Sequence, residues 1–156
     1  MARGLLLACG NTLRGDDGVG WWIGGQVEQN PPLPDLEVIL AHQLLPEHAE
    51  LVSCADVVVF VDCSAVTAAG AVSVVPVAPA AELPRILTHH LDPAALLRMA
   101  GDLFGRTPKT AAAVTVGGQQ FGLAEGLSDV VQASVPAAVA AVEQAFLASD
   151  PEAQRF

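Results

Sequence analysis

The sequence predicts an α/β fold, in which a mostly parallel, twisted sheet of about five strands lies between helices on both faces as a three-layer sandwich. Short apolar runs typical of buried strands alternate with segments of helical periodicity, which favours parallel strands joined by helices. Hydrophobic residues make up 52% of the 156-residue chain, enough for a sizeable core. No internal repeat or long linker divides it, so we expect residues 1–156 to form a single domain.

Five apolar runs predict strands. The run at residues 57–61 (VVVFV) contains only β-branched and aromatic residues, which is typical of a central strand buried on both faces. The other runs are more mixed in composition, and they lie at residues 5–9, 36–41, 71–77 and 111–116.

Four segments predict helices. Apolar residues recur at helical spacing over residues 19–27, although two adjacent glycines within this segment lower its helix propensity. Another helix has a good N-cap residue, Asp92, followed by a proline, and Gly101 is expected to end it. The remaining helices are expected over residues 46–55 and 128–147. The last one contains a proline that should kink it or divide it in two.

Composition excludes several classes of function. The chain carries a net charge of −10 with only seven basic residues, which argues against nucleic-acid binding because phosphate contacts need clustered Lys and Arg. Its three cysteines form no C-x-x-C pair, so we expect no disulfide framework and a reducing, cytoplasmic location. The apolar stretch at residues 57–81 is interrupted by an aspartate and two prolines, and we therefore expect no membrane insertion.

The most informative motif is the loop after the first predicted strand. Residues 10–20 read GNTLRGDDGVG, and glycines in such a loop allow the backbone to approach a ligand closely. The adjacent carboxylates of Asp16 and Asp17 would repel a phosphate, and the glycine spacing is not that of the dinucleotide fingerprint. Paired acids at this place point instead to cation binding or acid–base chemistry.

Other polar residues follow the strands at the edge where open α/β sheets bind their ligands. Asp62 interrupts the apolar third strand, and it either caps a turn or serves as a ligand or acid–base group, since burying it alone is costly. His42 and Gln43 follow the second strand, and His89 and His90 precede the third helix. Two carboxylates and an imidazole form an O,O,N set that suits Ni²⁺, Zn²⁺ or Co²⁺ better than Ca²⁺ or Mg²⁺.

Nucleophilic chemistry has less support. The sequence contains no G-x-S-x-G elbow, and no histidine lies close in sequence to Cys63 and Ser64, which follow a strand. Ser128 fits the N-cap of the last helix better than a nucleophile. His48 is expected at the surface of the second helix, and the tryptophan pair at residues 21–22 suits either a contact patch or the core.

Motifs along nearly the whole chain carry a family resemblance. They are Gly10-Asn11-x-Leu13-x-x-Asp16-Asp17-x-x-Gly20, the strand ending in Asp62, Thr88-His89-x-Leu91, Glu125-Gly126-Leu127-Ser128 and Val135-Pro136-x-Ala138-Val139. In this order the motifs resemble those of the hydrogenase maturation endopeptidases. The resemblance implies that Asp17, Asp62 and His89 are both the metal ligands and the catalytic residues. The family often has Glu at the first of these positions, and Asp keeps the ligand type with a shorter reach.

The resemblance also implies a substrate. Such enzymes cut the C-terminal extension off the precursor of a [NiFe] hydrogenase large subunit after nickel insertion. The Ni²⁺ belongs to the substrate and signals that it is ready, while other divalent ions can occupy the site in vitro. The ion would polarise the scissile carbonyl or activate water, and a carboxylate would move protons.

The sequence leaves three points open. Residues 41–47 read AHQLLPE where many relatives have an Asp-Gly-Gly-Thr-type segment associated with substrate choice, so the particular hydrogenase is undetermined. A non-proteolytic nickel-binding assembly factor on the same fold is one alternative to the peptidase. A metal-free aspartic protease is another, and it requires the carboxyls of Asp17 and Asp62 to share a proton.

Overall fold

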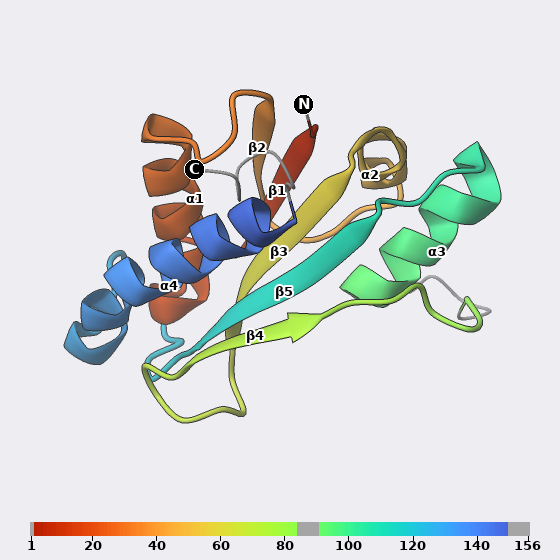
Figure 1. The fold of residues 1–156 in the computed structure, drawn as a ribbon. Helices are drawn as coiled ribbons and strands as arrows, with labels where there is room; N and C mark the ends of the chain where they lie inside the picture. The colour runs from red at the N-terminus through yellow and green to blue at the C-terminus, as the bar shows by residue number, and fades with distance from the viewer. Residues whose placement is uncertain (1, 84–90, 150–156) are drawn as a thin grey trace.

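A single five-stranded sheet forms the centre of the computed structural model, which describes residues 2–83 and 91–149 (Figure 1). In sequence order its strands are β1 (Gly4–Cys9), β2 (Leu36–Ala41), β3 (Val57–Ser64), β4 (Val72–Pro76) and β5 (Thr110–Gly117). The spatial order is β2-β1-β3-β5-β4, with β4 alone running antiparallel at one edge. The predicted mostly parallel sheet is therefore confirmed.

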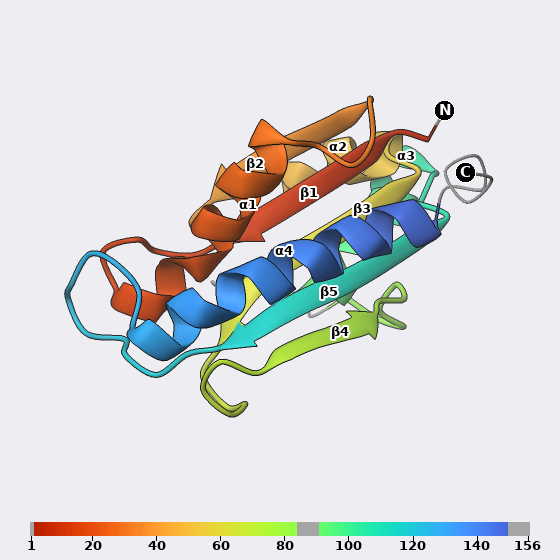
Figure 2. The same cartoon turned by 60° about the vertical axis from the view of Figure 1, so that its left-hand side comes forward.

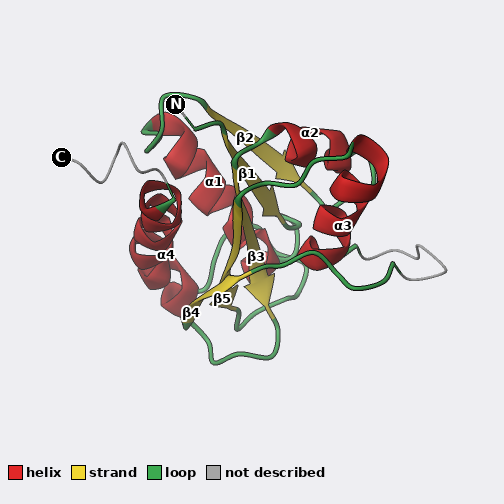
Figure 3. Ribbon diagram, turned by 45° about the vertical axis from the view of Figure 1, so that its right-hand side comes forward, coloured by secondary structure: helices red, strands yellow, loops and turns green. Residues whose placement is uncertain are grey.

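Helices cover both faces of this sheet, as the two turned views show (Figures 2 and 3). One face carries α1 (Val19–Gln29) and α4 (Asp129–Ala148), and the other carries α2 (His48–Cys54) and α3 (Pro93–Phe104). A 3-10 turn, η1 (Gly15–Gly18), leads into α1. The predicted three-layer sandwich is confirmed.

Side chains along each strand point alternately to the two faces of the sheet, and this produces one hydrophobic cluster on each face. In β1, Leu6 and Ala8 face α1 and α4, whereas Leu5 and Leu7 face α2 and α3. Every residue of β1 is buried, because helices cover the strand from both sides. β2 and β3 pair with opposite edges of β1, so the strand order reverses here. In open α/β sheets such a reversal places a crevice at the carboxyl ends of the strands.

The helix ends differ in places from the sequence prediction. Asp92 is the N-cap of α3, as predicted, and its Oδ1 accepts a hydrogen bond from the Ala95 N–H at 2.7 Å. The prediction that Gly101 ends α3 is wrong, because the helix continues to Phe104 and its C-cap is Gly105, which adopts a left-handed φ of 70°. A Cβ at Gly101 would lie 3.1 Å from the methyl of Thr107, so this glycine provides room for the chain that follows the helix.

The last helix is one continuous element. α4 runs through Pro136 from Asp129 to Ala148, so of the two predicted alternatives, a kink or a division at the proline, the division is wrong. By length and composition this helix is apolar enough to cross a membrane. Its core-facing side chains recur every three or four residues and pack on the sheet together with α1, and they are Val131, Val135, Ala138, Val142 and Phe146.

Two glycines of α1 should respond oppositely to the same substitution. A Cβ at Gly20 would lie 2.5 Å from the carbonyl oxygen of Cys9, whereas a Cβ at Gly25 meets no atom within 4 Å. We expect Gly20→Ala to cost about 2 kcal/mol or more through overpacking. Gly25→Ala should gain about 0.5–1 kcal/mol because alanine favours the helix. Urea unfolding of both variants measures the difference, and effects of the same sign would contradict the packing described here.

Candidate functional site

Asp17 and Asp62 line one pocket at the carboxyl ends of β1 and β3. The pocket has a volume of about 360 Å³ and lies where the strand order reverses. His42 and Gln43, which follow β2, line the same pocket, and so does Leu91 just before α3. Residues from distant parts of the chain thus meet at one edge of the sheet, as expected from parallel topology.

The position of Asp17 is fixed by its own loop. Asp17 lies in η1, is half-buried, and accepts a hydrogen bond from the backbone N–H of Asn11 at 2.9 Å through Oδ2. A Cβ on Gly10 would overlap the backbone carbonyl of Asp17, so the glycine after β1 allows the two halves of the loop to pack together. In this structure Gly10 therefore provides room for the protein's own backbone.

Asp62 ends the buried part of β3. The residues from Val57 to Val61 are fully covered, whereas the Asp62 side chain opens into the pocket and its Oδ1 accepts the Cys63 N–H at 2.7 Å. Although solvent reaches this carboxyl, the surrounding protein removes much of its hydration. Desolvation, assisted by the negative charge of Asp17, raises the pKa of Asp62 to about 6.

The raised pKa of Asp62 has a consequence for stability. Its folded-state pKa of about 6 exceeds the ordinary value of 3.8, so between these pH values the folded protein binds the proton more tightly than the unfolded chain. The contribution of Asp62 to stability therefore falls as pH rises through that window. We expect Asp62→Asn to raise the Tm of the metal-free protein at pH 7 by about 3 °C, allowing for solvent screening.

Melting both proteins between pH 4 and pH 7 checks this expectation. The difference in Tm should shrink steadily toward the lower limit, where the wild-type carboxyl is largely protonated in the folded state and partly protonated in the unfolded chain. A variant that is less stable than the wild type at pH 7 would contradict the desolvation of Asp62.

Asp16 has a different role from its neighbour. Its side chain is 0% exposed, and its carboxylate accepts four hydrogen bonds, from the backbone N–H groups of Gln119, Gln120 and Ser128 and from the Ser128 hydroxyl, at 2.7–2.8 Å. Burial alone would raise the pKa of Asp16, but these hydrogen bonds outweigh it and lower the pKa. The interpretation of Asp16 and Asp17 as paired functional acids is wrong, because Asp16 fastens the loop before α4 to the loop after β1.

Two other expectations need revision. Ser128 occupies the predicted N-cap position of α4, but its hydroxyl donates to Asp16 in place of capping the helix. His48 is buried, and its Nδ1 accepts the Leu45 N–H at 2.9 Å, so the expectation of a surface histidine is wrong. The imidazole stabilises the turn that leads into α2.

The environment of the cysteines disfavours a thiolate nucleophile. Burial, with a further contribution from Asp17, Asp62 and Asp16, raises the pKa of Cys63 to about 12. Burial and the charge of Asp62 raise that of Cys9 to about 12 as well. Both thiols therefore stay protonated at neutral pH. All three cysteines are free, consistent with the predicted lack of disulfides.

The predicted histidine ligand is not covered by the structure. His89 and the neighbouring His90 lie outside the described residues. Within residues 2–83 and 91–149, no three His, Cys, Asp or Glu side chains gather closely enough to hold a metal ion. The metal-binding roles of Asp17, Asp62 and His89 therefore stay predictions.

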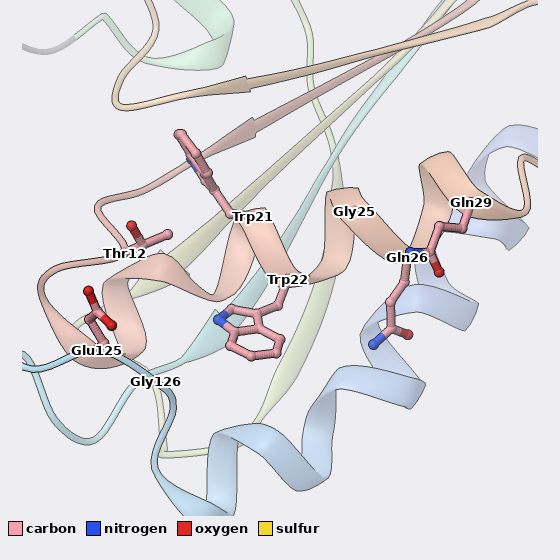
Figure 4. Close-up of a pocket in the computed structure, with 8 residues that line it drawn as sticks. All are labelled: Thr12, Trp21, Trp22, Gly25, Gln26, Gln29, Glu125 and Gly126. Carbon is pink, nitrogen blue, oxygen red and sulfur yellow. The ribbon is translucent and has the colours of Figure 1, made fainter.

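The adjacent tryptophans have separate environments. Trp21 is half-buried, its Nε1 donates to the Ala41 carbonyl at 3.0 Å, and its ring meets that of His42 edge-on at a centroid distance of 5.7 Å. Trp22 is 50% exposed. Both line a second pocket, which also contains Glu125 from the motif before α4 (Figure 4).

Solved structures of hydrogenase maturation proteases superpose on this chain. The hydrogenase maturating endopeptidase HybD from E. coli matches with a TM-score of 0.71 and 24% identity, over 94% of this chain and 91% of that chain. The [NiFe] hydrogenase maturation protease HycI from Thermococcus kodakarensis KOD1 matches with a TM-score of 0.68 and 21% identity, over 92% and 91%. The [NiFe] hydrogenase maturation protease HybD from Thermococcus kodakarensis matches with a TM-score of 0.67 and 23% identity, over 91% of this chain and 97% of that chain.

Matches by sequence alone are lacking. No protein-family model and no curated protein matches the chain. At these identities the structural likeness establishes the fold, which extends over nearly the whole length of both partners in each pair. The chain therefore has the fold that these hydrogenase maturation proteases share.

Proposed function

We propose that this protein is an endopeptidase that removes the C-terminal extension from the precursor of a [NiFe] hydrogenase large subunit. The observation that carries the proposal is the meeting of Asp17 and Asp62 in one pocket at the carboxyl ends of β1 and β3. The order of motifs along the chain supports it, as does the fold shared with the maturation proteases. The three free thiols are consistent with a cytoplasmic protein.

The two carboxylates suit different parts of peptide hydrolysis. In the metal-free protein a pKa of about 6 places Asp62 close to neutral pH, where a carboxylate can accept a proton and return it, and a divalent ion in the pocket would lower this pKa. Asp62 would take a proton from the water whose oxygen attacks the scissile carbonyl carbon. It would then deliver this proton to the leaving nitrogen as the C–N bond breaks. Asp17, held by the Asn11 N–H, supplies a second negative group at the same pocket.

Nickel enters the proposal as part of the substrate. Two carboxylate oxygens and the imidazole of His89 form a donor set that suits Ni²⁺, and the positive charge would offset the repulsion between Asp17 and Asp62. Three ligands leave coordination positions that the precursor's own groups can fill. We therefore propose that the protease recognises nickel already held by the precursor.

A proton-sharing dyad is the alternative mechanism for these two carboxyls, and the hydrogen bonds described for each of them involve another partner. Asp17 accepts from Asn11, and Asp62 accepts from Cys63, so neither of these bonds joins the two carboxyls. A dyad of the aspartic-protease type needs such a shared proton.

Precursor prepared with and without nickel tests the proposal. We expect the purified protein to shorten the nickel-loaded precursor to one product and to leave the nickel-free precursor intact. Intact-mass spectrometry measures both reactions, and elemental analysis of the protease serves as the control for metal carried by the enzyme. Equal cleavage of the two precursors would contradict recognition of substrate nickel, and no cleavage of either would contradict the peptidase itself.

A further inference from the structure

A second groove lies beside the acidic pocket, along the exposed side of α1. It has a volume of about 560 Å³ and runs between α1 and the loop before α4 (Figure 4). Trp22 and Glu125 line it from these two elements, and Gln26 and Gln29 extend it along the helix. Trp22 is 50% exposed, a large apolar surface for a side chain with no evident role in the core.

The floor of this groove contains a glycine that the fold does not require. Gly20 and Gly24 of α1 are needed for packing, because a Cβ would approach the Cys9 carbonyl oxygen to 2.5 Å and the Leu40 side chain to 2.6 Å, respectively. Gly25 lies in the helix interior, and a Cβ there would meet nothing within 4 Å. A helix-interior glycine is destabilising by about 0.5–1 kcal/mol relative to alanine. Its effect here is to keep the helix backbone open at the bottom of the groove.

The lining determines which ligand fits. Glu125 provides a carboxylate, Trp22 an exposed ring face, and Gln26 a side-chain amide. The described lining contains no lysine, arginine or histidine, and the whole chain has a net charge of −10. An aromatic ring face beside a carboxylate favours a guanidinium or ammonium group. Side-chain amides can form hydrogen bonds with the N–H and C=O groups of an extended peptide.

The groove also adjoins the acidic pocket. Trp21 lines the groove, and its ring contacts His42, which lines the pocket that contains Asp17 and Asp62. We propose that the groove docks an extended, basic segment of the substrate polypeptide whose scissile bond enters the acidic pocket. This inference rests on the proposed peptidase function, and it assigns a cationic side chain of the substrate to the space between Trp22 and Glu125.

Filling the groove tests the inference without disturbing the core. Gly25→Leu adds a side chain where a Cβ meets nothing, and Glu125→Gln removes the carboxylate. Their matched controls are Ala140→Leu on the exposed side of α4 and Glu28→Gln on α1 outside the groove. We expect each groove variant to raise the KM for nickel-loaded precursor about tenfold. The kcat should change by less than about threefold, and the controls should resemble the wild type.

A binding measurement separates failure of this inference from failure of the proposed function. Two labelled eight-residue peptides, alternating alanine with arginine and alanine with glutamate, are titrated against the wild type and Gly25→Leu by fluorescence anisotropy. We expect the arginine peptide to bind the wild type and Glu28→Gln, but to lose affinity about tenfold for Gly25→Leu. This outcome would support the groove even if the wild type cleaved no precursor.

Three results would overturn the inference. One is equal affinity of the arginine peptide for wild type and Gly25→Leu, and another is equal binding of the arginine and glutamate peptides. The third is a dimer of the wild type, detected by sedimentation, that Gly25→Leu dissociates, because the groove would then hold a second copy of the chain.

Discussion

Replacing Asp16 with alanine is expected to destabilise the protein by at least about 3 kcal/mol. The substitution leaves the buried N–H group of Ser128 and the partly buried N–H groups of Gln119 and Gln120 without their acceptor. Asparagine should not rescue the protein, because its amide group would place a donor against these donors. Urea unfolding measures the loss, with Asp129→Ala, an exposed acid beside Ser128, as the control expected to change stability by less than about 1 kcal/mol.

The pH dependence of this effect has a definite sign. Because the folded-state pKa of Asp16 is lower than the ordinary value of 3.8, its stabilisation is fully present above that pH. It is lost as the pH falls through the folded-state pKa. The gap between wild type and Asp16→Ala should therefore narrow in acid. An Asp16→Ala variant as stable as the control at pH 7 would show that the four hydrogen bonds do not hold the loops together.

Asp17→Asn and Asp62→Asn are each expected to slow processing of nickel-loaded precursor at least about a hundredfold. Asparagine keeps the size of the side chain but removes the charge and the ability to accept a proton. The control is Asp35→Asn, which changes an exposed acid that precedes β2 at the opposite ends of the strands. The measurement is the initial rate of product formation, and full activity in either pocket variant would remove that residue from the site.

Local patterns were sufficient to predict the elements of the sheet and the meeting of Asp17 and Asp62. Apolar runs such as residues 57–61 indicate a buried strand by themselves, and parallel strands bring their carboxyl ends to one edge. The strand order β2-β1-β3-β5-β4 could not be predicted in the same way. Pairing joins segments far apart in the chain, and no local pattern specifies which strands become neighbours.

The role of Asp16 was missed for a similar reason. Two adjacent aspartates look equivalent in sequence, but η1 turns one into the interior and the other toward the pocket. The partners of Asp16 lie 103 to 112 residues away, so nothing near it in sequence reveals them. The one signal in the sequence for a partner of Asp16 was the motif before α4, which contains Ser128. Its hydroxyl was expected to cap the helix, and in the structure it donates to Asp16.

The glycines of α1 show the same limit. Gly24 and Gly25 are indistinguishable as helix-weakening residues, but the first packs against the sheet and the second opens to the groove. Helix periodicity shows that two adjacent residues point in different directions from α1. It does not show which of them faces the sheet until the buried face of the helix is known. The tryptophan pair at residues 21–22 suited either a contact patch or the core by sequence, and in the structure Trp21 is half-buried against His42 whereas the Trp22 ring is exposed.

The measurement that tests the central claim most directly is the intact mass of nickel-loaded precursor after incubation with the wild type and, in parallel, with Asp62→Asn. A thermal melt of each protein at pH 7 accompanies it. We expect the wild type to produce one shortened subunit and Asp62→Asn to produce none, although the variant melts at a temperature no lower than the wild type. A wild type that leaves the precursor mass unchanged, or an Asp62→Asn variant that shortens it at the wild-type rate, would contradict the claim that this pocket is a proteolytic site.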